Sequence, residues 1–93
     1  MFAIWWPLIA ISALFIVRLA LSKILDWFQN NKTSTSSYGE LIKERLASGD
    51  YRVVAGIFDK RGIKTANTSW EADELDDDLK QYFKGRDRLR VEI

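Results

Sequence analysis

The chain has 93 residues, which leaves room for one small domain at most. It contains no cysteine and no histidine, so disulfide bonds, thiolate zinc sites, imidazole ligands and Ser-His or Cys-His nucleophilic pairs are all excluded. The net charge of +1 is too small to create a strong field for nucleic acid. We therefore expect no catalytic residue, no metal site and no bound cofactor.

The N-terminal end of the chain predicts a single transmembrane helix over residues 1–28. Residues 1–17 contain no ionisable side chain. Aromatic pairs at residues 5–6 and 27–28 would form the outer and inner interfacial belts, separated by roughly 32 Å along a helix, which matches a bilayer core of about 30 Å. A shorter span over residues 2–17, with Arg18 at its inner boundary, is the alternative register.

Arg18 is an intramembrane charge in the longer register. A charged side chain within the bilayer costs about 2.5–3.5 kcal/mol at the centre and less toward the edge. The side chain either snorkels to the inner headgroups, or it pairs with an acidic group or a bound lipid of a partner subunit.

Charge asymmetry sets the expected orientation. Lysine and arginine follow the span and none precede it, so the positive-inside rule places the N-terminus outside and the C-terminal domain in the cytoplasm, or in the stromal or matrix equivalent. A cleavable signal peptide would carry its positive charge ahead of the apolar run instead. We expect an integral, single-pass membrane protein.

One side of this predicted helix carries small residues. Small side chains let a second helix approach closely in lipid, so this side is a candidate helix-docking face. At 100° per residue it consists of Ala3, Ala10, Ala13, Val17 and Ala20.

The remaining chain divides into a polar linker, residues 29–37, and a small soluble domain, residues 38–93. The linker sequence QNNKTSTSS has no apolar residue and reads as a flexible tether. The domain carries eleven lysines and arginines against twelve acidic residues, so it is nearly neutral. Its core would be marginal at this length.

Hydrophobic periodicity predicts an α-β-β-α-β order for the domain. Apolar spacing of three and four residues predicts a first helix over residues 38–48, and turn residues then separate two strands of a hairpin, residues 51–58 and 63–68. A second helix is expected from Trp70 to about residue 84, with Ser69 as its N-cap. Strict alternation over residues 89–93 predicts a last strand, which gives a two-layer α+β domain.

Two charged clusters in the domain could carry function. The acidic residues 71–78 invite a metal assignment, but on a helix they would fan around the axis and match its dipole instead. Near the C-terminus, Lys84 and three arginines could make a basic patch. Arg86, Arg88 and Arg90 would share one side of a strand and form a basic contact face for lipid headgroups, with nucleic acid a weaker candidate; the alternative is that these are ordinary solubilising charges. Lys60, Arg61 and Lys64 add a second basic group at the hairpin.

These features favour a non-catalytic accessory, assembly or stabilising subunit of a larger integral-membrane complex. Its partners would be the membrane subunits and the lipid bilayer, and nucleic acid is not expected. Two alternatives remain at this stage. One is a membrane-tethered module that binds anionic lipid or nucleic acid through its basic face, and the other is a small membrane-active protein that associates with itself.

Overall fold

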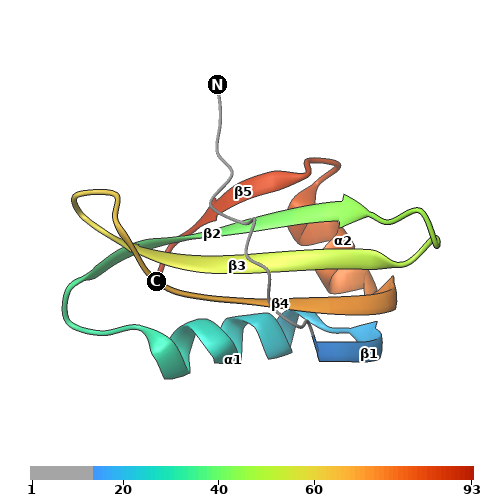
Figure 1. The fold of residues 1–93 in the computed structure, drawn as a ribbon, viewed down its shortest axis with the longest axis horizontal. Coiled ribbons are helices and arrows are strands. Elements are labelled where there is room, and N and C mark those ends of the chain that lie inside the picture. Colours follow the sequence, from blue (N-terminus) through green and yellow to red (C-terminus); the bar gives the residue numbers. More distant parts are fainter. Residues whose placement is uncertain (1–13) are drawn as a thin grey trace.

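A five-stranded sheet and two helices make up the part of the protein that the structure describes. The computed structural model describes residues 14–93. In chain order the elements are β1 (Leu14–Leu19), α1 (Leu21–Asn31), β2 (Ser36–Arg45), β3 (Tyr51–Asp59), β4 (Lys64–Leu75), α2 (Asp77–Phe83) and β5 (Arg88–Val91). The strands lie in the order β1-β4-β3-β2-β5, so β1 and β5 form the two edges (Figure 1). Only β1 and β4 are parallel; the other three pairings are antiparallel.

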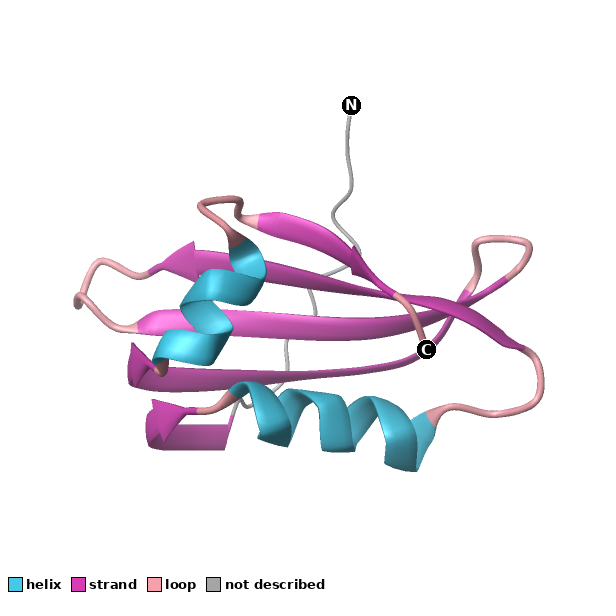
Figure 2. Ribbon diagram, turned by 180° about the vertical axis from the view of Figure 1, so that it is seen from behind, coloured by secondary structure: helices cyan, strands magenta, loops and turns pink. Residues whose placement is uncertain are grey.

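Both helices lie on the same face of the sheet (Figure 2). The other face, which α1 and α2 do not cover, is called the open face below. Strand β3 lies at the centre of the sheet, and seven of its residues in succession, from Val53 to Asp59, are buried. β3 is therefore buried on both faces, which suits its run of β-branched and aromatic side chains.

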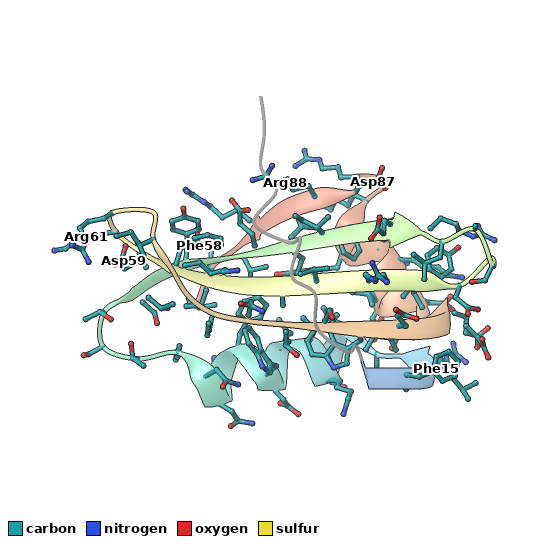
Figure 3. All side chains as sticks on the ribbon, viewed as in Figure 1. Phe15, Phe58, Asp59, Arg61, Asp87 and Arg88 are labelled. Carbon is teal, nitrogen blue, oxygen red and sulfur yellow. The ribbon has the colours of Figure 1, made fainter. Side chains whose placement is uncertain are left out.

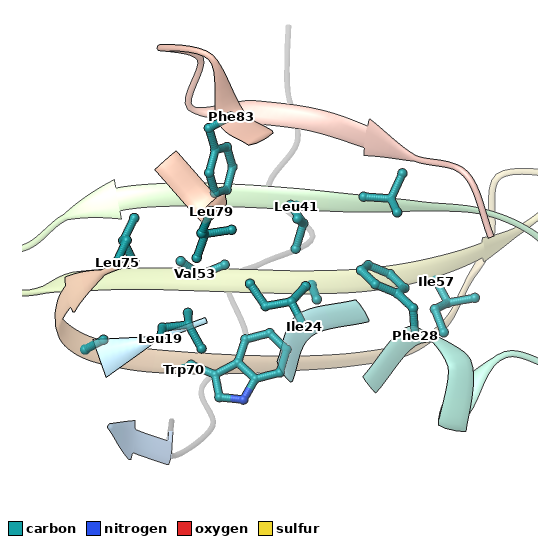
Figure 4. Packing of buried hydrophobic residues seen from close by; sticks show 13 residues of the cluster. Leu19, Ile24, Phe28, Leu41, Val53, Ile57, Trp70, Leu75, Leu79 and Phe83 are labelled. Atoms are coloured by element: carbon teal, nitrogen blue, oxygen red, sulfur yellow. The ribbon is translucent and has the colours of Figure 1, made fainter. Parts of the chain in front are cut away.

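The hydrophobic core fills the space between the helices and the sheet. Figure 4 shows Ile24 and Phe28 of α1 above one part of the sheet, and Leu79 and Phe83 of α2 above another. All four side chains are buried. The sheet contributes alternate residues to the same layer, as a period of two requires. These residues are Leu41, Val53, Ala55, Ile57, Trp70, Ala72 and Val91.

The closest approach between a helix and the sheet lies at Gly39 of β2. The ring of Phe28 packs directly over this glycine, and a Cβ atom at Gly39 would overlap the ring edge. Glycine is therefore needed here for space rather than for backbone freedom. The contact fixes how near the C-terminal half of α1 lies to β2.

The predicted transmembrane helix is not present in the described residues. Leu14–Leu19, which the prediction placed inside the span, form strand β1 and pair with β4 in parallel, so that Ile16 lies opposite Ala72. The backbone leaves the strand at Ala20, which is extended and precedes α1 as its N-cap. A run of leucine, isoleucine, phenylalanine and valine suits a buried or edge strand as well as a membrane helix, and pairing with β4 decides between them.

The expected inner aromatic belt is part of the core instead. Phe28 is 1% exposed, and Trp27 packs edge-on against Trp70 with ring centroids 6.3 Å apart. Helix α1 has eleven residues, and between residues 14 and 93 no helix is long and apolar enough to cross a bilayer. The fold class with a spanning helix, the membrane assignment and the integral single-pass localisation are therefore corrected. Residues 1–13 of the expected span lie outside the described residues.

One predicted helix is a strand, and the other is a strand in its first part and a helix in its second. Residues 38–48 were expected to be helical, but β2 occupies Ser36–Arg45, because Gly39 and Leu41 alternate toward the core and match β3 opposite Ile57 and Ala55. The second helix was expected from Trp70, but β4 continues to Leu75 and α2 covers only Asp77–Phe83. Pairing along the whole of β3 outweighs the helical spacing of these apolar residues.

The segment assigned to a linker lies within ordered elements at both ends. Gln29, Asn30 and Asn31 close α1, while Ser36 and Ser37 begin β2. Four residues, 32–35, connect the two elements, and within them the Thr33 backbone N–H donates to the Ser36 hydroxyl at 2.8 Å. This connection is a short hydrogen-bonded turn between a helix and a strand.

The overlap at Gly39 makes a direct prediction. Gly39→Ala should lower the free energy of unfolding by about 1–3 kcal/mol, because either the Phe28 ring or the strand must shift. Phe28→Leu removes the ring edge, so the double variant should lose at least about 0.5 kcal/mol less than the sum of the single losses. Urea denaturation of the full chain measures all three. Strict additivity, or an unchanged Gly39→Ala variant, would contradict the packing described.

Candidate functional site

The edge strand β1 exposes two large apolar side chains. Phe15 is 58% exposed and Val17 is 65% exposed, and they alternate with the half-buried Ile16. Figure 3 shows Phe15 projecting away from the body of the sheet. Within residues 14–93, β1 pairs only with β4, so its outer edge carries no further strand. An apolar strand edge of this kind is a ready template for another chain.

Arg18, near the end of β1, forms an ion pair at this edge. Its guanidinium Nε lies 3.7 Å from Glu74 Oε2, and both side chains are more than half exposed. The predicted intramembrane charge is therefore a surface residue of the sheet, opposite Glu74 in the β1–β4 register. An exposed pair of this kind contributes at most about 1 kcal/mol.

The predicted helix-docking face is divided by the structure. Val17 lies on β1 and Ala20 is the N-cap of α1, so these two residues do not share a helix. Ala3, Ala10 and Ala13 lie outside the described residues. Of the two described residues of this set, Val17 contributes to the apolar surface at the β1 edge.

The opposite edge strand, β5, carries two of the three predicted contact arginines. Arg88 and Arg90 lie on β5 and are exposed, while Leu89 and Val91 face the core. Both guanidinium groups already have partners on the open face: Arg88 Nη2 donates to Glu40 Oε1 at 2.9 Å, and the Arg90 guanidinium lies 3.9 Å from the centre of the Tyr38 ring. Figure 3 places Arg88 on β5 beside Asp87.

Arg86 lies apart from these two arginines. It precedes β5, in the turn after α2, where its backbone N–H donates to the Phe83 carbonyl at 2.9 Å. Its side chain lines a groove of about 530 Å³ beside α2 and β5, called the α2–β5 groove below. Its lining includes the cationic residues Lys84 and Arg86 and one acidic residue, Asp78, and it also includes Arg90, whose guanidinium lies on the open face over Tyr38.

The rest of the open face is nearly balanced in charge. Arg52, near the start of the central strand β3, donates to Glu71 on β4 at 3.0 Å and to Glu44 on β2 at 3.4 Å. Tyr38 stacks on Phe58 with ring centroids 5.2 Å apart. On this face the charge of Arg52 is therefore paired with two glutamates of the neighbouring strands.

The acidic cluster of residues 71–78 is dispersed by the change from strand to helix. Glu71 and Glu74 bind arginines of neighbouring strands, and Asp76 caps α2 by accepting a hydrogen bond from the Leu79 backbone N–H at 2.8 Å. Hydrogen bonding with the Asp50 side chain raises the pKa of the Asp73 carboxyl above its usual range. Among the described residues, no three acidic side chains gather where they could hold a metal ion.

The β3–β4 hairpin turns around the carboxylate of Asp59. Asp59 Oδ1 accepts hydrogen bonds from the backbone N–H of Ile63 at 3.0 Å and of Arg61 at 2.9 Å, and Oδ2 lies 3.3 Å from Arg61 Nη2 (Figure 3). The bond from Ile63 is the main reason that the pKa of Asp59 lies below its usual range, and Arg61 adds to the effect. The predicted basic group at this hairpin is therefore partly a structural partner of Asp59.

Asp59→Asn tests the role of this carboxylate. Because the folded-state pKa lies below the unfolded value of about 3.9, the charged form stabilises the folded chain above that pH. This contribution is lost as the pH falls through the lower pKa of the folded state. At about pH 7 the wild type should unfold at a higher temperature than the variant, and the difference should shrink toward about pH 2.

Thermal unfolding followed by circular dichroism measures this difference. Asp26→Asn removes the same charge from the exposed side of α1 and serves as the matched control. The control should show a smaller difference at neutral pH. If the unfolding temperatures of the two variants differ from that of the wild type by the same amount at every pH, Asp59 does not stabilise the turn through its charge.

Comparisons of the chain with models of known protein families, with curated proteins and with solved structures found no match. The residues at the two sheet edges therefore carry the functional argument.

Sequence reasoning missed one residue of these edges. Phe15 was counted as one apolar residue of a span, and only the β1–β4 pairing shows that it is exposed. Lys84 was grouped with the C-terminal arginines; it adopts the left-handed conformation that ends α2, with φ of 51°, and lines the groove. The aromatic and β-branched residues 15–17 were the available signal for β1.

Proposed function

We propose that this chain is a non-catalytic assembly protein, which joins protein chains by extending its sheet at strand β1. The observation that carries the proposal is the unextended β1 edge with Phe15 and Val17 exposed beside it. The occupant that fits this edge is β1 of a second copy.

The sequence of β1 complements itself in one antiparallel register. If Ile16 lies opposite Ile16 of the second copy, Phe15 of each copy lies opposite Val17 of the other. Directly opposed residues share a face of the sheet, so both exposed side chains meet an apolar partner on the open face. An aromatic residue opposite a β-branched residue contributes roughly 0.2–1 kcal/mol.

Charge does not oppose this pairing. In the same register Arg18 lies opposite Leu14 of the second copy, so no two like charges face each other directly. Arg18 also keeps its partner Glu74 within its own chain. In such a two-fold symmetric dimer both copies contribute the same surface to the interface, which is the commonest arrangement of soluble homodimers.

The non-catalytic part of the proposal rests on residue types and on pairing. The chain has no cysteine or histidine, and the arginines of the open face are bound to glutamates or to an aromatic ring. The same pairing disfavours the alternative of a face for anionic lipid or nucleic acid, because those arginines would have to leave existing partners.

Lysine substitutions at the β1 edge test the proposal. Phe15→Lys and Val17→Lys should each shift the full chain from dimer toward monomer, because a charge in the paired edge must be desolvated or splayed away. Sedimentation velocity over a range of micromolar concentrations measures the shift. Ile63→Lys, which changes another exposed apolar residue at the β3–β4 turn, is the control and should leave the dimer intact.

Cysteine pairs test the register, since the natural chain has no cysteine. A mixture of Phe15→Cys and Val17→Cys chains should form a disulfide more readily than either variant alone. The two substituted positions lie directly opposite, at about 4.5–5.5 Å between Cα atoms, whereas each position is offset from its own copy. A wild type that remains monomeric, or equal cross-linking in all three samples, would refute the proposal.

A further inference from the structure

We infer that the β5 edge and the α2–β5 groove together form a binding site for an extended acidic segment of a partner protein, which adds to the sheet as a sixth strand. This site lies at the opposite edge from β1, and it does not depend on the proposed pairing of two copies. Three observations support the inference: the direction of the β5 backbone groups, the charge of the groove and its apolar floor.

The backbone of β5 has outward-pointing hydrogen-bonding groups. The Lys43 N–H donates to the Asp87 carbonyl at 2.7 Å, and the β2–β5 register continues this pair to Leu89 opposite Leu41. In an antiparallel pair such positions alternate with positions whose N–H and C=O point away from the neighbour. The backbone groups of Arg88 and Arg90 therefore point outward, and no hydrogen bond within residues 14–93 reaches them.

The groove beside this edge has an excess of positive charge. Lys84 and Arg86 have no ion pair with any other described residue, whereas Arg88 is bound to Glu40 and Arg90 lies over Tyr38. Asp78 is the one acidic residue of the lining. The unpaired cations thus lie on the helix side of β5, and they complement acidic rather than basic side chains.

The groove floor is apolar beneath these cations. Leu21 at the start of α1, Tyr82 of α2 and Leu89 of β5 are half-buried and line it. A low-dielectric surface under a charge strengthens its attraction for an opposite charge. The stems of glutamate side chains can lie on this floor while their carboxylates reach Lys84 and Arg86.

An added strand satisfies both features at once. Alternate side chains of a strand point to opposite faces, so every second residue of the segment faces the groove. The residues opposite Arg88 and Arg90 have their side chains on the open face and exchange backbone hydrogen bonds with them. Acidic residues at the alternate positions then face Lys84 and Arg86. When a strand is added to a sheet in this way, backbone hydrogen bonds provide the affinity and contacts of alternate side chains provide the specificity.

The probe is an end-blocked peptide of four Glu-Thr repeats, titrated into the full chain and followed by amide NMR spectra. We expect binding that shifts the amide signals of Arg88 and Arg90 and weakens with added salt. Arg86→Glu should weaken the binding about tenfold. Lys32→Glu makes the same charge reversal at the exposed end of α1 and should leave it unchanged.

Two further peptides separate the backbone contribution from the charge contribution. Replacing each threonine by proline keeps every glutamate but removes the N–H groups that face β5, so most of the binding should be lost. Replacing each glutamate by lysine should abolish it. The inference is overturned if the Glu-Thr peptide does not bind at about 1 mM, if the proline peptide binds equally well, or if Arg86→Glu has no effect. These outcomes are independent of whether Val17→Lys dissociates a dimer.

Discussion

The packing of two helices on one face of the sheet is the constraint on which the rest of the structure depends. Phe28 of α1 can lie low enough to be buried only because β2 has glycine at position 39. Leu79 and Phe83 of α2 fill the remaining part of the same layer. The core side chains of β2, β3 and β4 on this face pack against the helices. Binding to other molecules is therefore left to the sheet edges and the α2–β5 groove.

The open face shows how a sheet without a helix on it can remain stable. Arg52 bridges strands β2 and β4 across β3, Arg88 joins β5 to β2, and the stacked rings of Tyr38 and Phe58 join β2 to β3. Each of these contacts crosses between neighbouring strands, so they support the register as well as the surface charge. Arginines that look available in the sequence are therefore largely committed to the fold, and Lys84 and Arg86 stand out because they are not.

Part of the architecture could be predicted from the sequence, and the reasons for the failures are physical. The run at Tyr51–Asp59 and the turn around Asp59 have strong local signals, and the structure has a strand and a hairpin there. In residues 36–45, Tyr38, Leu41 and Ile42 satisfy a helical spacing and a strand alternation equally well, and the long β3 neighbour decides the outcome. The apolar residues 14–19 were joined to those before them, since no local feature shows that β4, more than fifty residues later, pairs with them. The arginines of the predicted basic contact face were grouped on residue type alone, and their separate environments depend on tertiary contacts that the sequence does not show.

The strand order also determines whether the association of copies of this sheet stops at a dimer or continues into a filament. β1 and β5 are the two ends of one sheet, so contact of β1 with β5 of the next copy would repeat without limit and build a filament. Such a contact would place Phe15 and Val17 of one copy on the same face as Arg88 and Arg90 of the other, so the apolar side chains would face charged groups instead of each other. A contact of β1 with itself is complete after two copies. The distribution of arginine along the two ends therefore favours a closed particle over a fibre, which protects a chain with such an apolar end strand from polymerising.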